Sequence, residues 1–102
     1  MSKYKAVKET VDGILFDSKK EARRWSELKL LSRAGEIYSL ARQIPFEIAI
    51  NGKKVFVYKA DFSYRDKNNA LIIEDVKGFK TPVYRLKKRC VEAAYNLQIR
   101  EI

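Results

Sequence analysis

The 102 residues include 22 lysine and arginine residues against 13 aspartate and glutamate residues, a formal net charge of +9 at pH 7. Such an excess favours a polyanion as partner, with nucleic acid ahead of an anionic membrane surface. The chain has no histidine and a single cysteine, Cys90, which excludes zinc sites with His ligands, zinc fingers, catalytic triads that use imidazole, and internal disulfides.

The sequence predicts neither a membrane span nor a secretion signal. No apolar run approaches the roughly 18 residues that a spanning helix needs, and the first residues, Met1 to Lys5, lack the apolar core of a signal peptide. We therefore expect one domain over residues 1–102, located in the reducing cytoplasm and without a membrane partner.

The first third of the chain predicts a hairpin followed by a helix. Within residues 1–16, the hairpin is expected over residues 3–16, around the Asp12-Gly13 turn. The helix is predicted over residues 18–34, because Ser18 and Glu21 form a capping box and Gly35 suits a helix stop. Its apolar stripe consists of Ala22, Trp25, Leu28 and either Leu31 or Ser32.

Three strands are predicted next, over residues 42–50, 54–64 and 71–77. Asn51-Gly52 is a strong turn signal between the first two, and residues 66–69 form a polar turn before the third. The third strand is apolar on both faces at its start, as expected of a central strand. The second strand is expected to place five side chains on one face: Phe56, Tyr58, Ala60, Phe62 and Tyr64.

A second helix and a short strand complete the predicted order. Thr81-Pro82 suits the start of a helix, and the last strand is expected over residues 97–102. The buried stripe of the helix is predicted to be Val83, Leu86, Cys90, Ala93 and Ala94. After the N-terminal hairpin, the order αβββαβ predicts an α/β fold over residues 17–102, with a mixed sheet flanked by two helices.

Two acids and a lysine lie on neighbouring predicted strands. Asp61 is on the second strand, and Asp75 lies two positions before Lys77 at the end of the third, so Asp75 and Lys77 share a face. The two carboxylates and the Val76 carbonyl are candidate ligands of Mg²⁺ or Mn²⁺, and Lys77 could orient or deprotonate a water or steady the developing charge. The alternative is a solvated edge where acids pair with lysines, but charge at the end of an apolar central strand is costly without a purpose.

The pattern resembles the PD-(D/E)XK nuclease superfamily, which includes restriction enzymes and Holliday junction resolvases. Residues 11–24 (VDGIxFDSKxEAxR) and 74–87 (EDVKGFKTxxYxxK) are similar to a small phage- and prophage-encoded branch, so the resemblance covers almost the whole chain. The chain departs from the pattern at Ala60, where the eponymous proline would stand, and at Asp75, where glutamate is commoner.

The resemblance implies a restriction-endonuclease-like fold and Mg²⁺- or Mn²⁺-dependent cleavage of DNA, in the host cytoplasm if a phage carries the gene. It also implies that Glu21 on the first helix reaches the metal, although Glu21 has an alternative role as the capping-box residue. Glu74 faces away from Lys77 by alternation and is interpreted as a structural acid. Trp25 and the aromatic strand face are interpreted as core and not as a base-stacking platform.

Basic residues on both helices are candidates for contacts with the DNA backbone. The second helix begins just after Lys77, and its N-terminus attracts phosphate, although an ordinary solvated face is the alternative. The candidates are Lys80, Tyr84, Arg85, Lys87 and Lys88 on the second helix and Lys19, Lys20 and Arg23 on the first, with Arg89 and Arg24 in the same two clusters.

The sequence therefore predicts an endonuclease that acts on branched or otherwise structured DNA. About 100 residues leave no room for a sequence-reading domain, so shape and backbone must carry recognition. Two equivalent cuts would need a homodimer. Two other interpretations remain open: a basic nucleic-acid-binding accessory protein with a vestigial nuclease site, and a membrane-surface or ribosome-associated basic protein.

Overall fold

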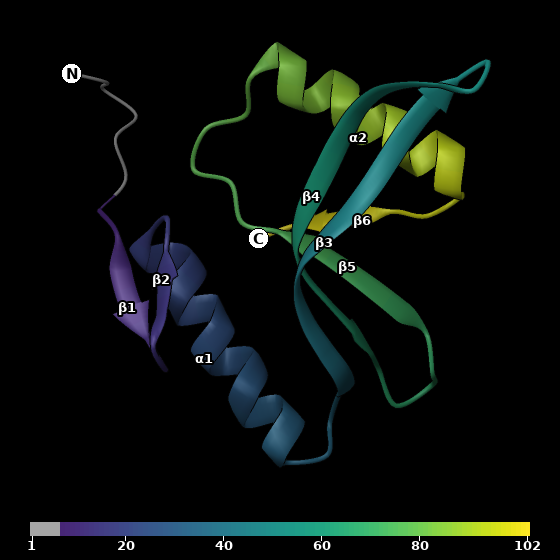
Figure 1. Ribbon diagram of the computed structural model, residues 1–102. Coiled ribbons are helices and arrows are strands. Elements are labelled where there is room, and N and C mark those ends of the chain that lie inside the picture. Colours follow the sequence, from purple (N-terminus) through teal and green to yellow (C-terminus); the bar gives the residue numbers. More distant parts are fainter. Residues whose placement is uncertain (1–6) are drawn as a thin grey trace.

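Residues 7–102, the part that the computed structural model describes, form two helices and two sheets (Figure 1). Residues 3–6 of the predicted hairpin lie outside this described part. In chain order the elements are β1 (Glu9–Val11), β2 (Ile14–Phe16), α1 (Lys19–Arg33), β3 (Tyr38–Ile50), β4 (Lys53–Arg65), β5 (Leu71–Asp75), α2 (Pro82–Tyr95) and β6 (Ile99–Glu101).

A four-stranded mixed sheet forms the centre, in the order β3-β4-β5-β6. Its first three strands are antiparallel neighbours, and β6 runs parallel to β5. The strands β4 and β5 are therefore interior, as the apolar start of the third predicted strand indicated. A separate sheet pairs β1 with β2, and α1 and α2 flank the main sheet (Figure 1). The predicted restriction-endonuclease-like αβββαβ fold is confirmed.

The first helix forms where its capping signals predict it. The Ser18 side chain accepts a hydrogen bond from the Glu21 backbone N–H at 3.1 Å, and the chain leaves the helix through Gly35 at φ 74°. Burial confirms three positions of the predicted stripe but not the fourth, which is exposed or half-buried. The buried residues are Ala22, Trp25 and Leu28, whereas Leu31 is exposed and Ser32 half-buried.

The second helix begins as expected. The Thr81 side chain accepts a hydrogen bond from the Tyr84 N–H at 3.0 Å, and Pro82 is the first helical residue. The helix ends at Tyr95, where Asn96 adopts a left-handed conformation with φ 52°, a common way to stop a helix.

The predicted apolar stripe of α2 is wrong. Its members are exposed or half-buried: Val83 (61% exposed), Leu86 (60% exposed), Cys90, Ala93 and Ala94. The face toward the sheet instead carries Tyr84 and Val91, seven residues apart. The rotation of the helix is fixed by Tyr84, whose ring stacks on Tyr58 at 6.4 Å and whose hydroxyl donates to Glu101 at 2.8 Å.

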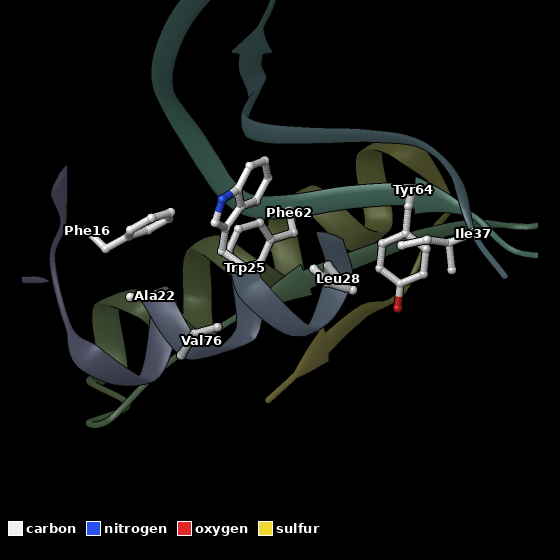
Figure 2. Close-up of a cluster of buried hydrophobic side chains, with 8 residues drawn as sticks. All are labelled: Phe16, Ala22, Trp25, Leu28, Ile37, Phe62, Tyr64 and Val76. Carbon is white, nitrogen blue, oxygen red and sulfur yellow. The ribbon is translucent and has the colours of Figure 1, made fainter. Parts of the chain in front are cut away.

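Two hydrophobic clusters stabilise the fold, one at each helix. The α1 cluster, drawn in Figure 2, contains Phe16, Ala22, Trp25, Leu28, Ile37, Phe62, Tyr64 and Val76. The α2 cluster contains Phe46, Ile48, Tyr58, Ala60, Ile73, Val91 and Ile99. The five side chains predicted to share one face of the second strand are thus divided between the two clusters. Because both helices pack against β4, residues 60–64 are all buried.

Three strand boundaries differ from the prediction by two residues or more, one of them the start of β6 at Ile99 in place of the expected residue 97. The strand β3 begins at Tyr38, earlier than the expected residue 42, because it continues through two residues with positive φ, Ser39 at 57° and Gln43 at 53°. The strand β5 ends at Asp75, two residues before the predicted end. Lys77 therefore lies in the loop between β5 and α2 and not on the strand.

Candidate active site

Asp61 and Asp75 face each other where β4 and β5 separate. The last backbone pair of the two strands is Phe62 with Glu74, and beyond it side-chain hydrogen bonds replace the backbone ladder. The Asp61 N–H donates to Asp75 Oδ1 at 3.0 Å, and the Val76 N–H donates to Asp61 Oδ2 at 2.7 Å. The Asp75 carboxylate is therefore held by the backbone of β4 and the Asp61 carboxylate by the backbone just after β5, which fixes both acids in a buried position.

One carboxylate oxygen of this pair has no hydrogen-bond partner in the part of the chain that the structure describes. Asp75 Oδ2 is buried and accepts no hydrogen bond within the described residues, a costly arrangement for a carboxylate. Burial raises the pKa of Asp75 to about 6, against the opposing effects of the Lys77 charge and the Asp61 N–H. Burial also raises the pKa of Asp61, although the Val76 N–H and Lys77 oppose it. A cation bound nearby would offset the cost of burying these two negative charges and would lower the pKa of both acids.

Lys77 lies close enough to act on all three predicted acids. Burial raises the pKa of Glu21, Asp61 and Asp75, and the positive charge of Lys77 opposes this rise at each acid. Its Nζ lies 5.2 Å from the centre of the Tyr84 ring, a cation–π contact. The loop after β5 thus brings Lys77 to the acids even though the strand ends before it.

Glu21, in the first turn of α1, is electrostatically coupled to this site. It is buried, and burial, followed by the negative charges of Asp61 and Asp17, raises the pKa of Glu21 to about 7. Nevertheless, the residues that the structure describes contain no group of three or more acids or cysteines arranged to hold a metal ion. Glu21 is thus an electrostatic neighbour of Asp61, and a direct contact with a metal stays a prediction, as does ligation by the Val76 carbonyl.

Three residues near the site were not predicted from the sequence. In the β3–β4 register Arg42 pairs with Phe62 and Ile44 with Ala60, so Gln43 lies opposite Asp61. The Gln43 side chain hydrogen-bonds to Asp61. A left-handed backbone in a strand is strained for glutamine, which is typical of functional positions. Arg42 lowers the pKa of Glu21, and its guanidinium lies 4.8 Å from the Phe16 ring.

The third residue that the sequence did not indicate is Glu101. It pairs with Asp75 across the parallel strands β5 and β6, and its negative charge raises the pKa of Asp75. Lys80 and Lys88 approach Glu101 at 3.2 and 3.8 Å, so two of the predicted DNA contacts are turned toward the β6 edge. A hollow of about 330 Å³ lies here, lined by Lys80, Lys88, Glu101, Arg85, Arg89 and Glu92.

The other predicted DNA contacts lie elsewhere on the two helices. Lys87 lies over the Phe56 ring at 5.3 Å, on the side of α2 that faces the β3–β4 hairpin. The three remaining candidates are exposed on α1: Lys19, Lys20 and Arg23. The basic face predicted for α2 is therefore divided, with Lys87 near the hairpin and Lys80 and Lys88 near β6.

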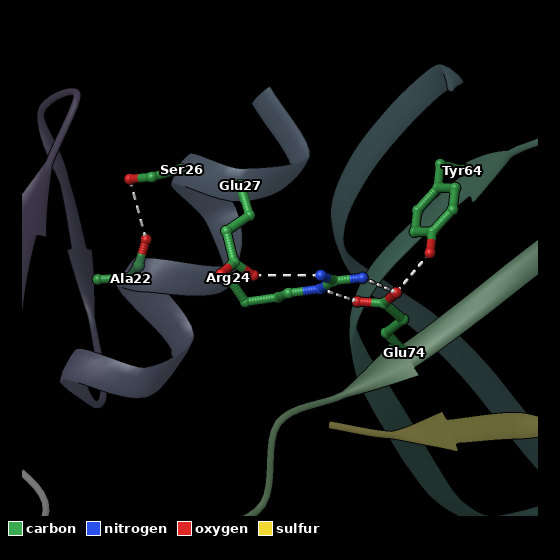
Figure 3. Close-up of polar contacts among 6 residues, drawn as sticks. All are labelled: Ala22, Arg24, Ser26, Glu27, Tyr64 and Glu74. Atoms are coloured by element: carbon green, nitrogen blue, oxygen red, sulfur yellow. Dashed lines mark hydrogen bonds and ion pairs between the residues drawn. The ribbon is translucent and has the colours of Figure 1, made fainter. Parts of the chain in front are cut away.

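Arg24, grouped with the basic cluster from sequence, instead binds Glu74 inside the protein (Figure 3). Its Nε and Nη2 donate to the two Glu74 carboxylate oxygens at 2.8 and 2.6 Å, and the Tyr64 hydroxyl donates to the same carboxylate. Glu74 is therefore a structural acid, as predicted. The arginine clamp ties α1, which carries Glu21, to the strand that carries Asp75.

The chain belongs to the family described as "Protein of unknown function (DUF1064)", which it matches over residues 1–101. No curated protein and no solved structure matches it. Among residues 7–102, no helix has the length and apolar character needed to cross a membrane. The family description leaves the activity open, so a functional proposal depends on the chemistry of the site.

Proposed function

We propose that this protein is an endodeoxyribonuclease that hydrolyses phosphodiester bonds with Mg²⁺ or Mn²⁺, on branched or otherwise structured DNA. The observation that supports this most strongly is the buried Asp61–Asp75 pair, with one carboxylate oxygen left without a hydrogen-bond partner among residues 7–102. Oxygen donors are the ligands that Mg²⁺ and Mn²⁺ prefer. The donor set at this site contains only oxygen, so these residues fit a hard divalent cation.

Asp61 and Asp75 would hold the cation, which would supply positive charge for the scissile phosphate and acidify the attacking water. Lys77 is placed to steady the negative charge that develops on the phosphoryl oxygens. Glu21, with a pKa raised to about 7, is poised to accept a proton near neutral pH. Gln43 and the Val76 N–H hold the Asp61 carboxylate in position.

The DNA backbone is proposed to pass the start of α2, near Tyr84 and Lys87. The net charge of +9 supports a polyanionic substrate. The protein is further proposed to act as a homodimer, since cutting both strands at equivalent positions needs two active sites.

The second candidate is a nucleic-acid-binding accessory protein with a vestigial site. One observation favours it: within residues 7–102, Glu21, Asp61 and Asp75 do not form a three-acid group able to hold a metal ion. In that case, the chain should bind DNA without cutting it.

A cleavage panel separates these two functions. The purified chain is incubated with linear duplex, flap, four-way junction and single-stranded DNA, each with Mg²⁺, with Mn²⁺ or with a chelator. We expect metal-dependent cleavage that is strongest on the branched substrates and absent in Asp61→Asn. Binding without cleavage of any substrate under both metals would instead support the accessory protein.

A further inference from the structure

The outer part of the β3–β4 hairpin extends beyond the rest of the sheet. The strand β5 pairs with β4 only from Phe62 to Arg65, so residues 45–59, here called the arm, have no other strand beside them among the described residues. Figure 1 shows the turn of this hairpin at the end of the molecule away from α1. Residues 49–55 at its tip are all exposed.

The arm begins beside the acid pair. Lys53 at its tip and Asp61 at its base lie on the same strand. A strand advances about 3.3 Å per residue, so the tip lies roughly 26 Å from Asp61. The arm therefore connects the active-site acids to a distant point on the surface through one continuous piece of backbone.

Positive charges follow the arm from base to tip. Lys77 lies over the Tyr84 ring, which stacks on Tyr58 of β4. Farther out, Lys87 lies over Phe56 of the same strand at 5.3 Å. At the tip, two adjacent lysines, Lys53 and Lys54, pair in the ladder with Ile50 and Ala49.

Few negative charges oppose this track. Residues 45–59 contain three lysines and a single acid, Glu47. In the ladder Glu47 pairs with Val57, three residues before Ile50, so this acid lies in the middle of the arm and not at its tip.

We propose that the arm is a second contact for duplex DNA, with Lys53 and Lys54 on backbone phosphates about 26 Å from the scissile phosphate at the Asp61–Asp75 cation site. At about 3.4 Å per nucleotide this distance is roughly eight base pairs. The inference rests on the proposed function, since it takes DNA as the polyanion. A two-stranded ribbon fits the major groove, and a second copy of the chain would oppose these lysines with its own positive charge.

The test uses binding and single-turnover cleavage of four-way junctions whose duplex branches end at different distances from the cleavage site. Lys53→Ala/Lys54→Ala should weaken binding on the order of 10-fold when the duplex extends well past eight base pairs, and lower the salt slope by about two. Duplexes too short to reach the tip should bind both proteins equally. Lys53→Arg/Lys54→Arg, which keeps the charge, should restore binding to the long duplex.

A matched control removes the same charge elsewhere. Arg33→Ala/Lys67→Ala changes the end of α1 and the β4–β5 turn, at the opposite end of β4 from the arm tip, and should leave the length dependence unchanged. Two results would refute the arm as a DNA contact and leave the proposed nuclease function standing. One is an equal effect of Lys53→Ala/Lys54→Ala at every duplex length, and the other is no effect on long duplexes that the wild type binds and cuts.

Two further outcomes also count against the arm. If Lys53→Ala/Lys54→Ala lost binding to phosphatidylserine vesicles but kept DNA binding, the tip would be assigned to a membrane surface. A wild-type chain that neither binds nor cuts any of these branched substrates would overturn the proposed function together with the arm.

Discussion

The Arg24–Glu74 clamp permits a prediction with a magnitude. The Glu74 side chain is 0% exposed and that of Arg24 is 21% exposed. The guanidinium meets the carboxylate with two hydrogen bonds, at 2.8 and 2.6 Å. Arg24→Met would leave the buried carboxylate with the Tyr64 hydroxyl as its remaining hydrogen-bond partner among the described residues. Breaking one side of a buried ion pair typically costs about 3–5 kcal/mol.

Because water can reach the vacated arginine position, we expect the lower end, about 3 kcal/mol. For a domain of roughly 100 residues this corresponds to a decrease in melting temperature of about 15 °C. Urea denaturation and thermal melts followed by circular dichroism measure both quantities. Arg24→Met/Glu74→Met should recover much of the loss, since replacing both partners by apolar groups removes the unpaired charge.

Glu27→Gln is the matched control on the same guanidinium. Glu27 is 54% exposed and contacts Arg24 Nη1 at 3.2 Å, and such a surface pair contributes about 0.5 kcal/mol or less. If Arg24→Met lost no more stability than Glu27→Gln, the clamp would not hold α1 to β5 and the structural role of Glu74 would be refuted.

Three further predictions concern the site. Glu21→Gln should lower cleavage while the melting temperature stays the same or rises, since glutamine still suits the capping box; an undiminished cleavage rate would leave Glu21 only a capping role. Burial raises the pKa of Asp75 to about 6 and that of Glu21 to about 7. The folded chain therefore binds more protons than the unfolded chain over roughly pH 4–7, and the stability of the metal-free protein should fall as pH rises through that window. Thermal melts should then show Mg²⁺ stabilising the protein at pH 8 but not at pH 5, and the opposite slope would contradict the assignment. Lys87→Ala should weaken binding to all DNA sequences alike and lower the salt slope by about one; unchanged binding would place the DNA elsewhere, for instance along Lys19 and Arg23.

Capping and turn chemistry made most of the fold predictable. Ser18, Thr81 and the Asn51-Gly52 turn act through local backbone bonds, so sequence alone locates both helices and the long hairpin. The rotation of α2 was not predictable in this way. It depends on Tyr84 reaching Tyr58 and Glu101, residues far away in the sequence.

Register explains why Gln43 was missed. The turn pairs Ile50 with Lys53, and continuing that register would place Arg42 opposite Asp61. A register shift between Ile48 and Ala49 moves the partner by one residue, to Gln43, and a one-residue shift exchanges the two faces of a strand. No sequence signal marks this irregularity.

The acid pair itself was predictable in part. The alternation of side chains and the end of an apolar strand indicated Asp61 and Asp75. The reciprocal backbone hydrogen bonds and the unpartnered Oδ2 of Asp75 depend on how the two strands separate, which the sequence does not specify. Lys77 was expected on the strand and instead reaches the acids from a loop.

The proposed activity is tested most directly by the single-turnover rate of cleavage of a four-way junction, measured with Mg²⁺ for the wild type and for Asp75→Asn. We predict cleavage that a chelator abolishes and that Asp75→Asn slows by at least about 100-fold, since a lost metal site costs several kcal/mol of transition-state stabilisation. Junction binding by the variant should be retained or strengthened, because one negative charge is removed. Equal cleavage rates for the two proteins, or a wild-type rate that is unchanged by the chelator, would contradict the metal-dependent nuclease.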